Sequence, residues 1–194
     1  MAPPQNLQRR RAITDGAIEV LAAAGIHGFS HRTVDEAAGL PNGTTANYFP
    51  SRDALLGAAA ERVLELHRLD MEAAHGAVTG PIDREGLIGL IAMSLEFSAA
   101  AHRNRYLAVY ELTLEATRRP ALQRTFDTMK DEATDFTLRQ HRDLGLDTTP
   151  EDVTTLITLF GGALYTLITG QAGPIDAATT RALARQMVAG IGQR

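Results

Sequence analysis

The sequence predicts an all-α protein of about nine helices, and three observations support this fold class. Apolar residues recur at helical spacing in almost every segment of the 194-residue chain. No segment alternates apolar and polar residues for long enough to make a convincing strand. Glycine, proline and small capping residues stand at the breaks between the periodic segments. The 44% hydrophobic content fits a globular protein with one large domain or two small ones.

Three helices are expected in the first fifty residues. A first helix is expected over residues 7–24, since its apolar residues fall on one face and Gly25 is placed to end it. Ser30 can cap a second, short helix, which Gly39 ends. A third short helix is expected to begin at Asn42 after a tight turn.

Six further helices are expected in the remainder of the chain. Their expected ranges are 51–77, 84–101, 104–119, 120–145, 150–171 and 177–191. A domain boundary is expected near residue 52. It divides the chain into an N-terminal domain over residues 1–52 and a helical-bundle domain over residues 53–194.

Composition and charge exclude several classes of protein. The chain has no cysteine, so disulfides, a catalytic cysteine and cysteine-ligated zinc are excluded. Because it also lacks a signal-peptide-like apolar stretch, a cytoplasmic location is expected. Residues 1–52 carry five basic and four acidic side chains, a charge of +1, whereas residues 53–194 carry fourteen and nineteen, a charge of −5. A slightly basic N-terminal segment followed by an acidic remainder of the chain suits local contact with phosphates.

Residues 39–52, GLPNGTTANYFPSR, are the segment most indicative of function. The short helix after the turn is too polar to be explained by core packing, but its Asn and Thr side chains suit the major groove of DNA. Tyr48 can donate its hydroxyl to a phosphate, whereas Phe49 is expected to anchor the helix in the core. Three arginines at positions 9–11 could form an arm along the phosphates or in the minor groove. A plain surface loop is the alternative interpretation.

The segment FSHRTVDEAAGLPNGTTANYFPSRDALL, residues 29–56, resembles the DNA-binding segment of the tetracycline-repressor (TetR) family of bacterial transcriptional regulators. The resemblance has no gap. It implies an N-terminal three-helix helix-turn-helix domain followed by a helical ligand-binding and dimerisation domain. By position, it makes Asn42, Thr44 and Ala46 candidates for base contact. Its candidates for phosphate contact are Asn47, Tyr48, Arg52, Ser30, His31 and Thr33.

Three residues depart from the family pattern. Ala46 stands where a tyrosine is frequent, and Arg52 stands where a lysine is more frequent. Thr45 stands where an apolar residue is usual, which would fit a side chain that points outward. Thr45 is therefore included among the candidate DNA contacts.

The uncharged stretch over residues 153–175 is the candidate dimer interface. One helix-turn-helix reads too few base pairs for useful affinity, so a homodimer on a palindromic, double-stranded operator is expected. The stretch is long enough to span a membrane, but its threonines, glycines and lack of flanking basic residues favour a partner-facing helix. The alternative is a central core helix of one chain. Candidate interface residues are Val153, Leu156, Ile157, Phe160, Gly161, Leu164, Leu167 and Ile168.

The family resemblance also implies a site for a small-molecule effector among the middle helices. The candidate lining residues are Met93, Glu96, Phe97, Tyr106, Tyr110, Leu114, Phe126, Met129 and Phe160. Their aromatic and methionine side chains are equally suited to an ordinary helical core. Glu96 is expected on a face otherwise suited to burial, where its carboxylate needs a partner such as Arg103, Arg105 or a polar ligand group.

Three functions compete at this point. The leading hypothesis is a ligand-responsive transcriptional regulator without a cofactor, and the family resemblance favours a repressor. Its effector would change the distance between the two DNA-reading motifs of the dimer. A metal-dependent enzyme is less well supported, because His67, Met71 and His75 share a helix face without a carboxylate pattern, and no metal ligand or catalytic residue is assigned. The third hypothesis is a helical sensor or scaffold that does not bind DNA.

Overall fold

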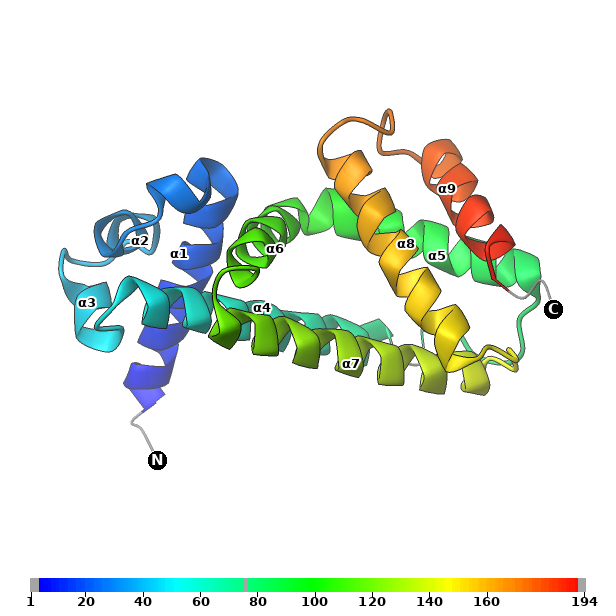
Figure 1. Cartoon of the computed structure of the whole chain (residues 1–194), viewed down its shortest axis with the longest axis horizontal. Helices are drawn as coiled ribbons and strands as arrows, with labels where there is room; N and C mark the ends of the chain where they lie inside the picture. The colour runs from blue at the N-terminus through cyan, green and yellow to red at the C-terminus, as the bar shows by residue number, and fades with distance from the viewer. Residues whose placement is uncertain (1–3, 75–76, 192–194) are drawn as a thin grey trace. The chain divides into compact units, whose positions relative to one another are not determined.

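The computed structural model describes residues 4–74 and 77–191, which form nine α-helices and no strand (Figure 1). The predicted all-α fold class is therefore confirmed. The helices are α1 (Pro4–Gly28), α2 (His31–Ala37), α3 (Thr44–Tyr48), α4 (Arg52–Ala74), α5 (Arg84–Ala101), α6 (Arg103–Ala116), α7 (Pro120–Asp143), α8 (Pro150–Ile168) and α9 (Ala177–Ala189). No helix within this part of the chain has an apolar stretch long enough to cross a bilayer.

The ends of the first three helices follow local sequence signals. Gly25 has φ 62° and ψ −169°, so the regular part of α1 breaks there, although one further turn continues to its end. Ser30 caps α2 in a reciprocal capping box with Thr33. The third helix begins at Thr44, two residues later than predicted, because Gly43 takes the left-handed conformation at φ 87° and serves as its N-cap.

By packing, the chain divides into two compact units. The first comprises Met1–Leu69 and Asn104–Met129, and the second comprises Asp70–Arg103 and Lys130–Arg194. The helix α6 and the start of α7 therefore pack with the N-terminal helices, although they are distant in sequence. The functional boundary near residue 52 remains a prediction.

One apolar core holds the first unit together. Ile13 and Leu21 of α1, Val34 of α2 and Leu55 of α4 are almost completely buried in it. Leu112 of α6 is buried in the same cluster, so α6 is part of this core. Burial of five such side chains contributes about 1.5–3 kcal/mol each relative to full exposure.

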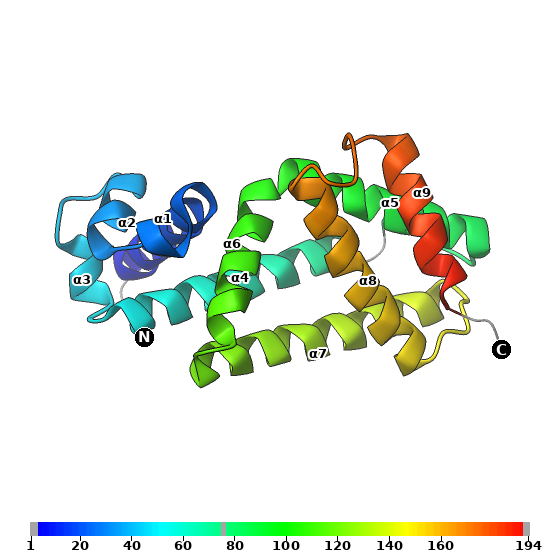
Figure 2. The ribbon, with the colours of Figure 1, turned by 45° about the horizontal axis from the view of Figure 1, so that its top comes forward.

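In the second unit, α5 packs extensively along α9, and α8 packs against both (Figure 2). The buried residues of α5 recur as Ile88, Ala92, Leu95 and Ala99, one helical stripe. The exposed edge carries an ion pair between Arg181 of α9 and Glu85 of α5, at 2.8 Å. The core of the second unit is therefore a layer of apolar side chains shared by three helices.

Candidate nucleic-acid interface

The helix-turn-helix begins with a close approach of α2 to α1. A Cβ added at Gly16 of α1 would lie 3.0 Å from the Cβ of Ala38 at the end of α2, which is closer than normal contacts allow. The chain then turns at Gly39, which has φ 65°. The amide of Leu40 donates to the carbonyl of Asp35 over 2.8 Å, and the Leu40 side chain packs on the core. The small residues at 16 and 39 thus allow the tight geometry of the motif.

Asp35 of α2 fixes the start of α3. Its carboxylate is completely buried and accepts hydrogen bonds from the Gly43 amide at 2.7 Å, the Thr45 amide at 2.7 Å and the Thr45 hydroxyl at 2.6 Å. Burial alone would raise the pKa of Asp35, but the hydrogen bonds from Thr45 and Gly43, assisted by the nearby His31, hold that pKa below its usual value. Asp35 is therefore the anchor of the short helix.

Sequence reasoning missed Asp35, although the sequence contains a signal that points to it. Both Asp35 and Thr45 are polar residues at inward positions of an otherwise apolar packing surface. Two such residues ten positions apart, on either side of a turn, indicate a buried polar pair.

The inward position of Thr45 corrects an expectation. Its side chain is completely buried against Asp35, so it neither points outward nor reaches a DNA base. The departure from the usual apolar residue is explained by the carboxylate opposite, which needs a donor rather than a methyl group.

Three candidate phosphate contacts instead form hydrogen bonds within the helix-turn-helix motif and stabilise it. Nε2 of His31 donates to the carbonyl of Phe49 over 2.7 Å, which fixes the end of α3. The guanidinium of Arg52 donates from Nε to the carbonyl of Phe29 over 3.2 Å and also to the carbonyl of Ile26. Thr33 completes the capping box of α2. Phe49 itself is 3% exposed, as expected for a core anchor.

The remaining candidates lie at the surface of the motif. Asn42, Ala46 and Asn47 are exposed, and so is Ser30 at the start of α2. Thr44 and Tyr48 are half-buried, and the Thr44 hydroxyl donates to the carbonyl of Pro41 over 2.6 Å. Three candidate base-reading positions, 42, 44 and 46, thus come together with position 47 on the outer side of the turn and α3. Arg32, which the sequence analysis passed over, is also exposed on α2.

The three N-terminal arginines do not form an extended arm, because all of them lie within α1. The guanidinium of Arg10 lies 4.6 Å from the ring centroid of Phe49, and Arg11 pairs with Glu65 of α4 at 2.8 Å. Arg9 is exposed. The helical conformation thus corrects the expectation of an arm in the minor groove.

Polar side chains of α6 reach the first helix of the motif. The Glu111 carboxylate accepts a hydrogen bond from the Ile26 amide over 2.9 Å, directly after the break at Gly25. Nδ2 of Asn104 donates to the Glu19 carboxylate over 2.7 Å. The broken end of α1 therefore receives its capping acceptor from α6.

A second link joins α6 to the start of α4. Glu115 is 7% exposed and pairs with Arg118 at 2.6 Å and Arg119 at 3.0 Å. Hydrogen bonds from Arg118 and Arg119 outweigh burial and lower the pKa of Glu115. Arg119 also pairs with Asp53 in the first turn of α4 at 2.7 Å. Two sets of polar contacts therefore connect α6 with the helices that carry the DNA-reading motif.

The candidate effector-binding residues are divided between the two units. Met93, Glu96, Phe97 and Phe160 belong to the second unit, and Tyr106, Tyr110, Leu114, Phe126 and Met129 belong to the first. Met93 and Phe97 are 56% exposed and Leu114 is 63% exposed, whereas the two tyrosines, Phe126, Met129 and Phe160 are half-buried.

Glu96 is exposed, so the expectation that it lies on a buried face is wrong. The buried stripe of α5 passes through Ala92, Leu95 and Ala99, which turns position 96 toward the outside of the helix. Arg103 donates instead to the carbonyl of Ile168 over 3.4 Å, and the Arg105 guanidinium lies 5.7 Å from the Tyr106 ring centroid.

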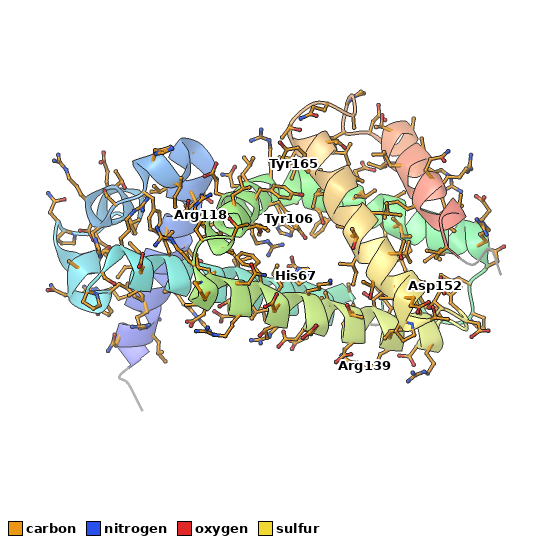
Figure 3. All side chains as sticks on the ribbon, in the orientation of Figure 1. His67, Tyr106, Arg118, Arg139, Asp152 and Tyr165 are labelled. Carbon is orange, nitrogen blue, oxygen red and sulfur yellow. The ribbon has the colours of Figure 1, made fainter. Side chains whose placement is uncertain are left out.

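The structure also corrects the expectation that the apolar stripe of α8 faces a partner chain. Five of its residues are buried inside their own chain, so they do not face a partner: Val153, Leu156, Leu164, Leu167 and Ile168. Ile157, Phe160 and Gly161 are partly exposed. The outer face of the helix instead carries Leu159, which is 40% exposed, and the exposed Gly162. Tyr165, labelled on α8 in Figure 3, is 43% exposed.

The metal hypothesis receives no support from the described side chains. No group of three or more His, Asp or Glu residues within residues 4–74 and 77–191 could hold a metal ion. His67 and Met71 lie on α4, but His75 lies outside the described residues.

The short exposed helix follows a tight turn and is held to α2 by the hydrogen bonds of Asp35 and His31. This arrangement defines a helix-turn-helix DNA-binding protein. Comparisons with known families agree. The family described as "Bacterial regulatory proteins, tetR family" matches residues 13–59, and "Tetracyclin repressor-like, C-terminal domain" matches residues 82–192. The chain belongs to the TetR family of transcriptional regulators, and its function is regulation of transcription rather than catalysis.

Several solved protein structures are similar to this protein over almost its whole length. The multidrug binding protein EbrR in complex with imidazole is 30% identical, with 92% of this chain and 94% of that chain covered and a TM-score of 0.67. EbrR in complex with ethidium is 29% identical, with 92% and 98% covered and a TM-score of 0.68. A TetR family member from Streptomyces coelicolor is 29% identical, with 93% and 98% covered and a TM-score of 0.71. No curated protein matches the chain in sequence.

Proposed function

We propose that this protein is a homodimeric repressor that binds a palindromic operator and releases it when a small molecule binds. The observation that carries the proposal is an exposed group formed by Asn42 in the turn and by Ala46 and Asn47 of α3, the helix that buried hydrogen bonds fix. Small polar side chains on a rigid short helix are suited to reading base edges in the major groove. A regulator of this kind acts in the cytoplasm.

The roles of the candidate contacts divide according to their burial. Asn42, Thr44 and Ala46 are assigned to the bases, while Asn47, Tyr48 and Ser30 are assigned to the phosphates. Arg32 joins the phosphate contacts as an exposed cation on α2. His31, Thr33 and Arg52 support this surface through their bonds within the motif.

The outer face of α8 is assigned to the partner chain. Leu159 and Tyr165 offer apolar area, and a Cβ added at Gly162 between them would meet no atom of the chain within 4 Å. A glycine that lacks such neighbours inside a helix weakens it by about 1 kcal/mol without a benefit to the monomer. Close approach of a second copy supplies a reason for it.

The proposed effector is a small organic molecule, of a class that includes planar cations. EbrR is a multidrug binding protein whose solved complexes contain ethidium and proflavin. Both compounds are fluorescent, so their binding to this chain can be measured directly by titration. Saturable binding of either compound that also weakens DNA binding would support an effector site, while addition without any effect would count against this class of effector.

Release from DNA is proposed to follow from a change in the distance between the two helix-turn-helix motifs of the dimer. The bond from the Ile26 amide to Glu111 of α6 offers one route, and the ion pairs that link Glu115 of α6 through Arg119 to Asp53 offer a second. A shift of α6 would therefore move both α1 and the start of α4. A few ångströms of error in the distance between the motifs would break several phosphate contacts at once.

The test is selection of sheared genomic DNA by the purified protein, followed by footprinting of the enriched duplex. The expected footprint has two-fold symmetry, and affinity is expected to fall steeply as salt rises. Replacement of Asn42 and Thr44 by alanine together with Tyr48→Phe should weaken binding by at least about 100-fold. A matched control replaces the exposed Thr128 and Gln186 by alanine and should bind as the wild type does. Equal binding by the triple variant would overturn the assignment.

A further inference from the structure

The recognition helix α3 is too short to maintain its own position. It has five residues, whereas isolated helices of fewer than about 12 residues are not stable in water. Its N-cap is Gly43, which has no side chain to accept a hydrogen bond from the first turn. The acceptors must therefore come from elsewhere in the chain.

Asp35 of α2 supplies these acceptors through space. Oδ2 accepts from the Gly43 amide, while Oδ1 accepts from both the amide and the hydroxyl of Thr45. Three short hydrogen bonds donated to one carboxylate hold their geometry well, since charge-assisted hydrogen bonds are about twice as strong as neutral ones. They fix both the starting point of α3 and its rotation about its own axis.

Rotation about the axis decides which side chains face outward. Thr45 is completely buried, and the helical rotation of about 100° per residue then turns Ala46 and Asn47 away from α2. A purely apolar contact at position 45 would allow sliding and rotation more easily, because dispersion contacts are not directional.

We propose that Asp35 and Thr45 form a buried positioning pair that sets the orientation of α3 and thereby the base specificity of this protein. This inference rests on the proposed DNA-binding function of the same helix. Neither residue touches DNA: both act through the side chains that α3 presents. The pair therefore controls the difference between specific and non-specific binding more than the overall attraction to the phosphates.

The experiment compares full-length Thr45→Val with Thr45→Ser. Valine preserves the shape of the side chain and removes the hydroxyl, whereas serine retains the hydroxyl. The probe is the duplex that wild-type protein enriches from sheared genomic DNA, and a scrambled duplex of the same length measures non-specific binding. Thermal melting and sedimentation of each variant report on the fold and on the oligomeric state.

Thr45→Val is expected to lose about tenfold in specific affinity, with non-specific affinity unchanged within about twofold. Thr45→Ser is expected to restore most of the specific affinity. Asp35→Asn should lose more, about 100-fold, because its amide group places a donor opposite the Gly43 amide. If the Asp35 variant does not fold, the valine and serine pair still decides the question.

Two outcomes would overturn the proposal. One is equal specific affinity for the valine and serine variants. The other is a parallel loss of specific and non-specific binding together with a lower melting temperature, which a merely structural role would produce. Wild-type protein that enriches no duplex would overturn the regulator function itself, and with it the role of the pair. That failure is distinguishable because it appears before any variant is compared.

Discussion

The helices α3 and α8 show two opposite ways of stabilising a functional helix. The short α3 depends on hydrogen bonds that the amides of Gly43 and Thr45 donate to Asp35 of another helix. The 19-residue α8 has its own capping box between Thr149 and Asp152, a proline in its first turn and a buried apolar stripe. The DNA-reading helix therefore depends on tertiary contacts for its structure, whereas α8 is largely specified by its own sequence.

The outward faces of the two helices differ in the same way. The surface of α3 carries Ala46 and Asn47, which are small enough for a crowded groove. The surface of α8 carries Leu159 and Tyr165, which are large and apolar. One surface suits a polar polymer and the other suits an apolar protein face.

The largest effect on stability is expected from truncation inside α8. Leu164 is 1% exposed, so Leu164→Ala should lower the free energy of unfolding by about 2–5 kcal/mol. Thr45→Val in α3 should lower it by only about 1 kcal/mol, since one hydrogen bond is lost without a cavity. Urea denaturation measures both, and equal losses would contradict the comparison.

Charge placed on the two outward faces should separate their functions. Tyr165→Glu is expected to weaken dimerisation by about 100-fold, because it buries a carboxylate in the proposed interface. Ala46→Glu should leave the dimer intact but abolish operator binding, because it places a negative charge against DNA. Analytical ultracentrifugation and DNA titration distinguish the two results. A dimer unaffected by Tyr165→Glu would remove α8 from the interface.

Two glycines offer a matched test of backbone conformation. A Cβ meets no atom within 4 Å at Gly43 or at Gly162, but only Gly43 has a positive φ, 87°. Gly43→Ala should therefore destabilise the protein by about 1 kcal/mol. Gly162→Ala should stabilise the monomer by about 1 kcal/mol and weaken the dimer. Thermal melting at low and high protein concentration checks both signs.

The smallest effect concerns pH. His141 is buried and its Nδ1 lies 2.9 Å from the Thr148 hydroxyl, and burial lowers its pKa from the ordinary value of 6.5. Its contribution to stability should be complete above pH 6.5 and should decline as pH falls from that value toward the folded-state pKa, because the unfolded chain takes up the proton first. His141→Gln should flatten this part of the curve in urea titrations between pH 7.5 and 5.5. An unchanged slope would contradict the assignment.

The contribution of Asp35 lies in a more acidic range. Its pKa is lowered in the folded protein, so its contribution should be complete above the ordinary value of 3.8 and should be lost as pH falls through the folded-state value. The pH dependence of stability is therefore separable for the two regions. His141 changes the stability of the second unit near neutral pH, whereas Asp35 changes the stability of the DNA-reading motif only in acid.

Local patterns in the amino-acid sequence predict the class of fold, the succession of helices and the position of the DNA-reading motif. These features depend on neighbours in the chain: the apolar period, the capping box at Ser30 and Thr33, and the turn glycine at 39. Their signals are local, so they can be read without knowledge of the packing.

Which face of each helix is buried depends instead on how the helices pack. Periodicity groups the residues of α8 into stripes, but it does not tell which apolar face packs on α5 and α9 and which remains at the surface. It also placed Glu96 on the wrong side of α5. The polar residues at positions 35 and 45 hint at a buried pair, but periodicity does not identify the amides of Gly43 and Thr45 as the donors to Asp35. Such contacts depend on the crossing of helices in space, which no local pattern encodes.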